Sequence, residues 1–217
     1  MTDKHNKPTI PDSWWESLLD RATNLRDQYQ EADPFPHVVM DGFLPTEVVE
    51  SAASALEESR SRVHWHHFHG RQERKRATRP GQSMRGPPEV QLVLRAMNDP
   101  RMVEALSILS STEDLEADPM FIGGGVHRID RGGFLGIHAD FNKHPTTRRY
   151  RRLNLLIYMN QDWDTSWGGD LELWDRPMER CVVRVPPVVN RAVLFNTATT
   201  SWHGHPDPLQ CPPGRCR

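Results

Sequence analysis

The chain has 217 residues, enough for one domain with a substantial core, and its formal net charge at pH 7 is only −2. This balance argues against a nucleic-acid-binding protein, and no apolar run is long enough to cross a bilayer. The polar N-terminus lacks the apolar region of a secretory signal, and the three cysteines have no metal-binding spacing, which favours a cytoplasmic protein with reduced thiols.

The first part of the chain, residues 1–119, is predicted to be a helical support region. The predicted elements are a helix over 12–28, a strand over 38–40, and helices from Thr46, over 89–97 and over 100–109. Asp12 or Ser13 is expected to cap the first helix. The apolar faces of these helices indicate packing against a sheet of the same domain rather than binding of a partner.

Two polar stretches between these helices carry many basic side chains. The run His64-Trp65-His66-His67-Phe68-His69 is rich in imidazole, but strand alternation would divide its histidines between two faces, which argues against a metal site. The stretch from Arg71 to Arg79 is interpreted as a solvated loop, with reception of an anionic substrate as the alternative.

From Met120 onward, short β-prone runs alternate with Gly, Pro, Asn and Asp. The predicted strands are 121–122, 126–129, 134–138, 153–159, 170–174, 181–185 and 192–195. This spacing is typical of an antiparallel barrel or jelly roll. We therefore predict a single α+β domain over 1–217 with a mainly β core, in which N-terminal helices pack outside a double-stranded β-helix formed by 120–217.

The most informative residues are His138 and Asp140, in the run Gly136-Ile137-His138-Ala139-Asp140-Phe141. On one strand, positions i and i+2 point to the same face, so both side chains would aim at one point. A second histidine, His203, follows far downstream in Ser201-Trp202-His203-Gly204. Two histidines and one carboxylate on one side of a metal form the facial triad of non-haem Fe(II) sites. Because His205 has the same strand parity as His203, geometry alone leaves either as the distal ligand.

Several motifs in the second half of the chain follow one another in a definite order. They are Gly132–Asn142, Arg152–Asn160, Trp167–Trp174, Asn190–Phe195 and Ser201–Pro206. Over Gly123–Arg217 this order resembles the prolyl-4-hydroxylase-like branch of the 2-oxoglutarate- and Fe(II)-dependent dioxygenases. The stretch Pro34–Leu44 also resembles the usual opening of such domains.

The resemblance implies that the metal ligands, which are also the catalytic residues, are His138, Asp140 and His203. The match to Ser-x-His-Gly favours His203 over His205. The fold implied is the same double-stranded β-helix that the strand pattern predicts.

The resemblance also implies a binding site for the distal carboxylate of 2-oxoglutarate. Arg217 matches the family's basic residue, and Tyr158 matches a tyrosine that often adds a hydroxyl donor. A guanidinium suits a carboxylate because it can form two parallel hydrogen bonds. Arg215 has the same strand parity as Arg217 and remains the alternative.

The activity implied is that of an enzyme, with Fe(II) as cofactor and 2-oxoglutarate as cosubstrate. Dioxygen would be used to hydroxylate an unactivated C–H bond of a small-molecule or peptidyl substrate, with release of succinate and carbon dioxide. Ascorbate is expected as the reductant, and no nucleic-acid or membrane partner is expected. Loops 71–88 and 143–151 are expected to select the substrate.

One feature departs from the family pattern. Family members usually continue through one more apolar strand after the arginine that matches Arg217, so the last strand of the core is expected to be truncated and Arg217 to lie on a frayed end. This departure motivates the alternative function, a non-catalytic cupin-like β-barrel that binds a metal or another ligand.

Overall fold

The computed structural model describes residues 8–59, 63–79 and 85–217. The helices are α1 (Asp12–Gln30), α2 (Thr46–Glu58), α3 (Pro88–Met97) and α4 (Pro100–Ser110), with a short 3₁₀ turn η2 (Thr165–Trp167). The strands are β1 (His37–Met40), β2 (Trp65–His69), β3 (Glu73–Thr78), β4 (His127–Arg128), β5 (Phe134–His138), β6 (Leu153–Ile157), β7 (Leu171–Trp174), β8 (Cys181–Val185), β9 (Ala192–Asn196) and β10 (His203–His205).

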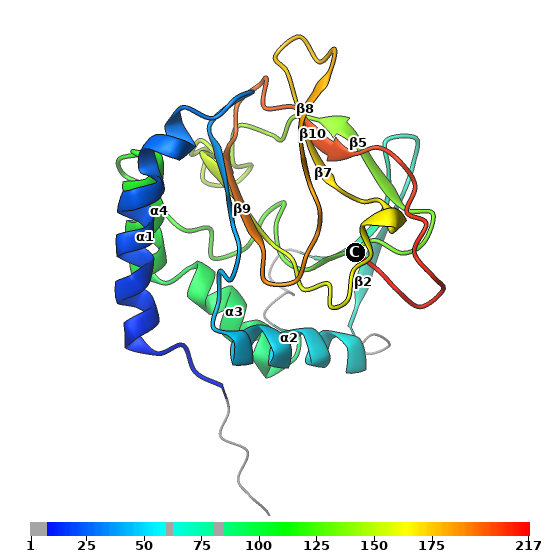
Figure 1. Ribbon diagram of the computed structural model, residues 1–217, viewed down its shortest axis with the longest axis horizontal. Helices are drawn as coiled ribbons and strands as arrows, with labels where there is room; N and C mark the ends of the chain where they lie inside the picture. The colour runs from blue at the N-terminus through cyan, green and yellow to red at the C-terminus, as the bar shows by residue number, and fades with distance from the viewer. Residues whose placement is uncertain (1–7, 60–62, 80–84) are drawn as a thin grey trace, which may run out of the picture.

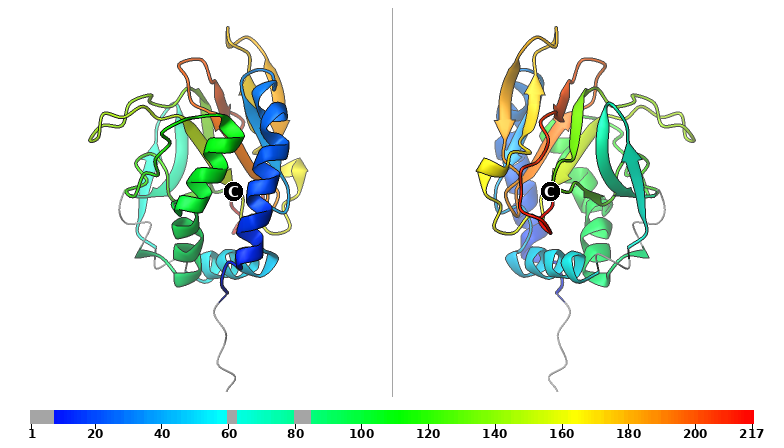
Figure 2. Two further views of the ribbon diagram at one scale, coloured as in Figure 1. Left: turned by 90° about the vertical axis from the view of Figure 1, so that its left-hand side faces the viewer. Right: turned by 90° about the vertical axis from the view of Figure 1, so that its right-hand side faces the viewer.

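The strands form two antiparallel sheets. One has the order β1-β9-β6, and the other has the order β2-β3-β5-β10-β7-β8, with β4 paired to β3. Figure 1 shows the helices outside the strands, with α1 and α4 along one flank of the strands and α2 and α3 below the strands. In Figure 2, α1 and α4 face the viewer in the left view, and the strands lie in front of them in the right view. The predicted β core with helices packed outside is therefore confirmed.

Strand β9 separates two apolar cores because its side chains alternate between faces. Ala192 and Leu194 pack against the helices, whereas Val193 and Phe195 face the space between the two sheets. All of these side chains are fully buried. Burial of a side chain the size of Leu194 or Phe195 contributes about 1.5–3 kcal/mol. The helical layer therefore holds one face of a sheet whose other face encloses the site described below.

The helical layer is built on the apolar faces that the sequence predicts. Trp15, Leu18 and Ala22 of α1 are buried and pack with Met102 and Ala105 of α4 in one core. The first helix has Pro11 as its N-cap residue and no side-chain capping hydrogen bond, so the predicted cap at Asp12 or Ser13 is wrong. Within the described residues, no helix has both the length and the apolar character needed to cross a membrane.

The interpretation of the stretch from Arg71 to Arg79 as a solvated loop is wrong. Glu73–Thr78 is strand β3, which pairs with β2 on one side and with β4 and β5 on the other. The many charged residues hide the strand in the sequence. Their long side chains extend to solvent or into a cavity while the backbone hydrogen bonds are satisfied within the sheet. Part of the predicted substrate loop 71–88 lies at 80–84, outside the described residues.

The predicted strand at 121–122 is also wrong. Phe121 has a φ of +51°, which is left-handed, and the chain turns there. The carboxylate of Asp118 accepts hydrogen bonds from the backbone N–H groups of Met120 and Ile122. This local bonding offers the backbone an alternative to strand pairing, so the apolar pair Phe121–Ile122 follows a turn instead of entering the sheet.

Candidate metal centre

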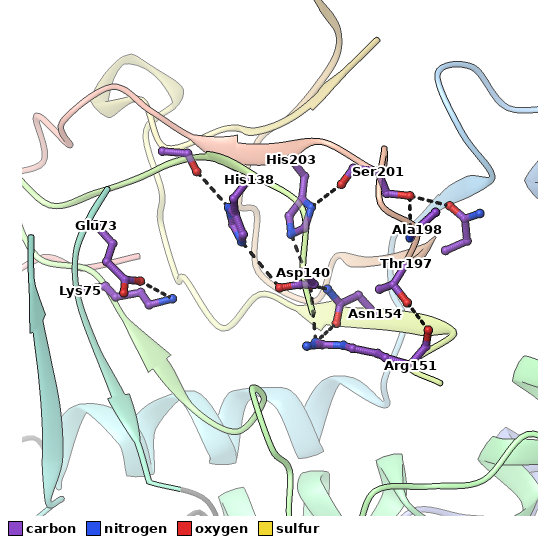
Figure 3. Close-up of polar contacts among 12 residues, drawn as sticks. Glu73, Lys75, His138, Asp140, Arg151, Asn154, Thr197, Ala198, Ser201 and His203 are labelled. Atoms are coloured by element: carbon purple, nitrogen blue, oxygen red, sulfur yellow. Dashed lines mark hydrogen bonds and ion pairs between the residues drawn. The ribbon is translucent and has the colours of Figure 1, made fainter. Parts of the chain in front are cut away.

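The structure brings His138, Asp140 and His203 together (Figure 3). His138 is the last residue of β5, His203 is the first residue of β10, and the two are directly paired across the sheet. Nε2 of His138 lies 3.7 Å from Oδ1 of Asp140, and Nε2 of His203 lies 3.6 Å from Oδ2. One ligand atom from each residue lies within 4.8 Å of the others.

Asp140 itself is not on the predicted strand, because β5 ends at His138. The carboxylate reaches the same point from the segment that follows the strand. The prediction of convergence therefore holds, although the period-2 argument for Asp140 is wrong in detail.

Both imidazoles are fixed by their own backbone. Nδ1 of His138 is 2.9 Å from the carbonyl oxygen of Gly136, and Nδ1 of His203 is 2.9 Å from that of Ser201. A carbonyl oxygen only accepts, so Nδ1 carries the proton and the lone pair is on Nε2. Each Nε2 faces Asp140. A hydrogen bond of this kind is the usual way in which a protein orients a metal-binding histidine.

The carboxylate of Asp140 is held by a short polar chain on the opposite side. Asn154 of β6 donates its amide to Oδ2 of Asp140, and Arg151 donates Nη2 to Oδ1 of Asn154. Nη2 of Arg151 also lies 3.6 Å from Oδ2 of Asp140. Burial tends to raise the pKa of Asp140, but the hydrogen-bonding contact with His138 and the positive charge of Arg151 outweigh it and hold the pKa well below its usual range. The carboxylate is therefore ionised at neutral pH.

The two histidines differ in their environment. Burial lowers the pKa of His203 to about 4, so its ring is neutral at neutral pH. Burial also tends to lower the pKa of His138, but contact with Asp140 and the bond to Gly136 outweigh it, and the pKa is raised above 6.5.

These residues fit a divalent metal such as Fe(II). Two imidazole nitrogens and one ionised carboxylate lie close together, and His138 would release any proton on Nε2 when a metal ion binds. Metal bonds to such donors are about 2 Å long, so donor atoms within 4.8 Å of one another can share an ion after small side-chain movements. The donors line an open cavity of about 1600 Å³, which gives an ion and further ligands access to them.

The predicted carboxylate-binding residues also lie together on this cavity. Nη2 of Arg217 is 3.1 Å from the hydroxyl oxygen of Tyr158, and Nε of Arg217 donates to the carbonyl oxygen of Gly169 at 2.6 Å. The backbone of Arg217 exchanges hydrogen bonds with Ile129. The end of the described chain is therefore tied to the sheet, in contrast to the expected frayed end.

The turn that precedes β7 requires glycine at position 169. Its φ is +80°, and a Cβ atom built there would lie 2.6 Å from Cδ2 of Leu209 and 3.0 Å from Cδ of Arg217. Only glycine allows this close approach without displacing its neighbours. The turn thus holds the Arg217 side chain against Tyr158.

The alternative residues lie in different surroundings. His205 is not part of the metal-ligand group, although it lines the same cavity. Arg215 is exposed, and its guanidinium lies over the Trp167 ring at 6.0 Å, whereas Arg217 is partly buried beside Tyr158. His127 lines the cavity without joining the ligand group.

Sequence reasoning missed Asn154 and Arg151 as supports of Asp140, and Lys75 as part of the cavity wall. A signal for Asn154 was present, since it is the one polar residue within the apolar run of β6. Asn154 and Tyr158 are separated by an even number of positions, so Asn154 is expected on the same face as Tyr158, which faces the space between the sheets. No sequence signal distinguishes Arg151 or Lys75 from the many other basic residues around them.

Comparison with known proteins agrees with this geometry. The model of the 2OG-Fe(II) oxygenase superfamily matches residues 124–216. No curated protein matches the chain.

Among solved structures, the chain is similar to a prolyl-4-hydroxylase from Pseudomonas putida, with a TM-score of 0.60 and 18% identity over 90% of this chain and 94% of that one. A prolyl hydroxylase from Trichoplax adhaerens, in complex with a hypoxia inducible factor oxygen degradation domain peptide fragment, has a TM-score of 0.63 and 18% identity over 91% of this chain and 88% of that one. The match to prolyl 4-hydroxylases from Phytophthora capsici has a TM-score of 0.63 and 18% identity, over 95% of this chain and 64% of that one.

At this identity, the solved structures show a common fold, the double-stranded β-helix. The His138–Asp140–His203 group lies within the residues that the family model matches. Residues 124–216 are therefore similar to the 2OG-Fe(II) oxygenase superfamily, and the chain has a prolyl-4-hydroxylase-like fold.

Proposed function

We propose that this chain hydroxylates an unactivated C–H bond of a peptidyl, amino-acid or metabolite substrate, with Fe(II) held by His138, Asp140 and His203. The observation that carries the proposal is the convergence of two Nε2 atoms and one carboxylate in a cavity. When bound, Fe(II) and 2-oxoglutarate supply the oxidative chemistry: one atom of dioxygen enters the C–H bond, the other enters succinate, and carbon dioxide is released.

The residues of the chain would bind the metal ion and orient its ligands. The backbone bonds of His138 and His203 direct their lone pairs inward, and Asn154 fixes the carboxylate of Asp140. The Asp140 carboxylate is a protein ligand that leaves no vacancy for a halide, which favours hydroxylation over halogenation.

Arg217 and Tyr158 would hold the distal carboxylate of 2-oxoglutarate. Arg217 supplies a permanent positive charge, and the Tyr158 hydroxyl beside it can donate to the same carboxylate. Burial raises the pKa of Tyr158, and the opposing charge of Arg217 does not cancel this, so the hydroxyl keeps its proton at neutral pH.

Other parts of the proposal rest on the family's general properties. We propose that ascorbate maintains the iron in its reduced state and that the protein acts in the cytoplasm. We further propose that residues 1–217 act as one domain, with the helical region supporting the core. Because several solved structures with this fold are prolyl hydroxylases, peptides that contain proline are the first substrates to test.

The test is succinate formation by the chain incubated with Fe(II), 2-oxoglutarate, ascorbate and a panel of proline-containing peptides and free amino acids. The proposal predicts substrate-dependent succinate that is absent from an Asp140→Ala variant. A wild-type chain that makes no more succinate than this variant with any substrate, and that binds its ligands without needing 2-oxoglutarate, would support the non-catalytic cupin-like alternative.

A further inference from the structure

His205 is a buried imidazole without a polar partner. Its side chain is only 2% exposed, and neither Nδ1 nor Nε2 has a hydrogen-bond partner among the described residues. Most buried polar side-chain atoms in proteins have at least one partner, and an unpaired one costs about 1–3 kcal/mol. The ring is therefore expected to meet a ligand that the protein itself does not supply.

The position of His205 on β10 determines what it faces. The pairing of β10 with β5 shifts its register between His203 and His205, and both side chains line the cavity of the candidate metal centre. Gly204 lies between the two histidines on β10. A Cβ atom added to Gly204 would lie only 2.7 Å from the carbonyl oxygen of Leu135, because β10 packs closely against β5 at this point. His205 accordingly lines the same cavity as His203, Tyr158 and Arg217.

The positive charge of Arg217 in this cavity favours an anionic ligand. Arg217 lies on the cavity wall, and so does Lys75, whose Nζ is 2.9 Å from a carboxylate oxygen of Glu73. A buried neutral imidazole offers one N–H donor and one acceptor nitrogen. A donor next to cationic groups in a buried site is suited to a carboxylate or keto oxygen, and hydrogen bonds to ionised acceptors are the stronger ones.

We propose that His205 is a positioning residue that donates an N–H hydrogen bond to an oxygen of 2-oxoglutarate, held between the metal ligands and Arg217. This inference rests on the proposed function, because it requires that 2-oxoglutarate occupy the cavity. It adds a donor that neither the family match nor the metal-ligand group includes. The oxygen atom of a water molecule is the alternative partner.

The experiment is an equilibrium titration of the Mn(II)-loaded chain of residues 1–217 with 2-oxoglutarate, which requires no turnover. We compare the wild type with His205→Leu, which removes the donor, and His205→Asn, which keeps an N–H group. The Leu variant is expected to bind 2-oxoglutarate about 10-fold or more weakly, and the Asn variant is expected to recover part of this loss. Affinity for Mn(II) alone is expected to remain within about twofold in both variants, since His205 is outside the metal-ligand group.

A second measurement separates this role from a merely structural one. Without 2-oxoglutarate, the Leu variant is expected to unfold at the same temperature as the wild type or a higher one, because it removes an unpaired polar group. A lower unfolding temperature in both variants, or loss of Mn(II) binding, would overturn the inference in favour of a structural role. Equal 2-oxoglutarate affinity in wild type and His205→Leu would overturn it in favour of water. If the wild type binds Mn(II) but not 2-oxoglutarate, the proposed function itself fails, and the inference fails with it.

Discussion

The side-chain amide of Asn154 donates to Oδ2 of Asp140, the carboxylate oxygen that lies 3.6 Å from Nε2 of His203. Arg151 in turn donates to the amide oxygen of Asn154. A strand from one sheet thus fixes the orientation of a carboxylate that follows a strand of the other sheet. The carboxylate is held before any ion binds, which lowers the cost of ordering the site.

Replacement of Asn154 by leucine is expected to weaken metal binding about 10–100-fold, the usual effect of losing a residue that orients a metal ligand. The substitution removes the amide that holds Asp140 but retains a side chain of similar size. Titration of the metal-free protein with Mn(II) or Co(II) measures the effect. Leu156→Ile, on the same face of β6, is the matched control and is expected to bind the metal normally. Equal affinity in Asn154→Leu and the control would show that the amide does not support the site.

Arg217 and Tyr158 are expected to determine the KM for 2-oxoglutarate. Loss of a hydrogen bond to a charged group costs about 1.5–3 kcal/mol, so Arg217→Leu is expected to raise this KM about 10-fold or more. Tyr158→Phe, which removes one neutral donor, is expected to raise it about five-fold. The measurement is the dependence of succinate formation on 2-oxoglutarate concentration.

Arg215→Leu is the control for this series, because the Arg215 guanidinium lies over Trp167 and not beside Tyr158. Its KM is expected to match that of the wild type. A larger effect for Arg215→Leu than for Arg217→Leu would reverse the assignment of the carboxylate-binding arginine.

Part of the site can be predicted from the sequence, because only a few residue types serve as metal ligands. His138, Asp140 and His203 stand out through residue type and through motif order, and their convergence follows once β5 and β10 pair. The β9 and β5 strands are also clear from their apolar runs. By contrast, β3 consists mostly of charged residues, and its identity as a strand depends on pairing with distant partners. Arg151 and Lys75 act through long side chains whose direction is determined only by the tertiary fold.

Tyr29 offers a stability test of the helical layer. Its side chain is 1% exposed, and its hydroxyl has no hydrogen-bond partner among the described residues. Tyr29→Phe keeps the buried ring and removes an unpaired polar group, so the free energy of unfolding is expected to stay the same or to rise by about 1–2 kcal/mol. Denaturant unfolding measures the difference. A fall of more than about 1 kcal/mol would mean that the hydroxyl has a partner in solution.

Asp99 at the start of α4 gives a prediction for the dependence of stability on pH. Its carboxylate accepts from the backbone N–H and from the guanidinium of Arg101, and the guanidinium contact holds its pKa below 3.8. Because the folded pKa is lower than the unfolded one, the charge stabilises the fold above the unfolded pKa. This contribution is lost as the pH falls through the folded pKa.

Asp99→Asn retains a capping side chain without the charge, whereas Asp99→Ala loses both. At pH 7, Asp99→Ala is expected to cost about 1 kcal/mol of unfolding free energy, and Asp99→Asn less. The difference between wild type and Asp99→Asn is expected to shrink as the pH is lowered below 3.8. Thermal unfolding of the three proteins from pH 7 downward checks this. A difference that grows on acidification would contradict the assigned sign.

The central claim is that one metal ion is shared by His138, Asp140 and His203. The most direct measurement is anaerobic titration of the metal-free chain with Fe(II), for the wild type and for alanine variants of each of these residues. His69→Ala, an exposed histidine of β2, is the matched control. The account predicts one ion per chain in the wild type and the control, and no comparable binding in any of the three variants. Undiminished Fe(II) binding by Asp140→Ala or His203→Ala would contradict it.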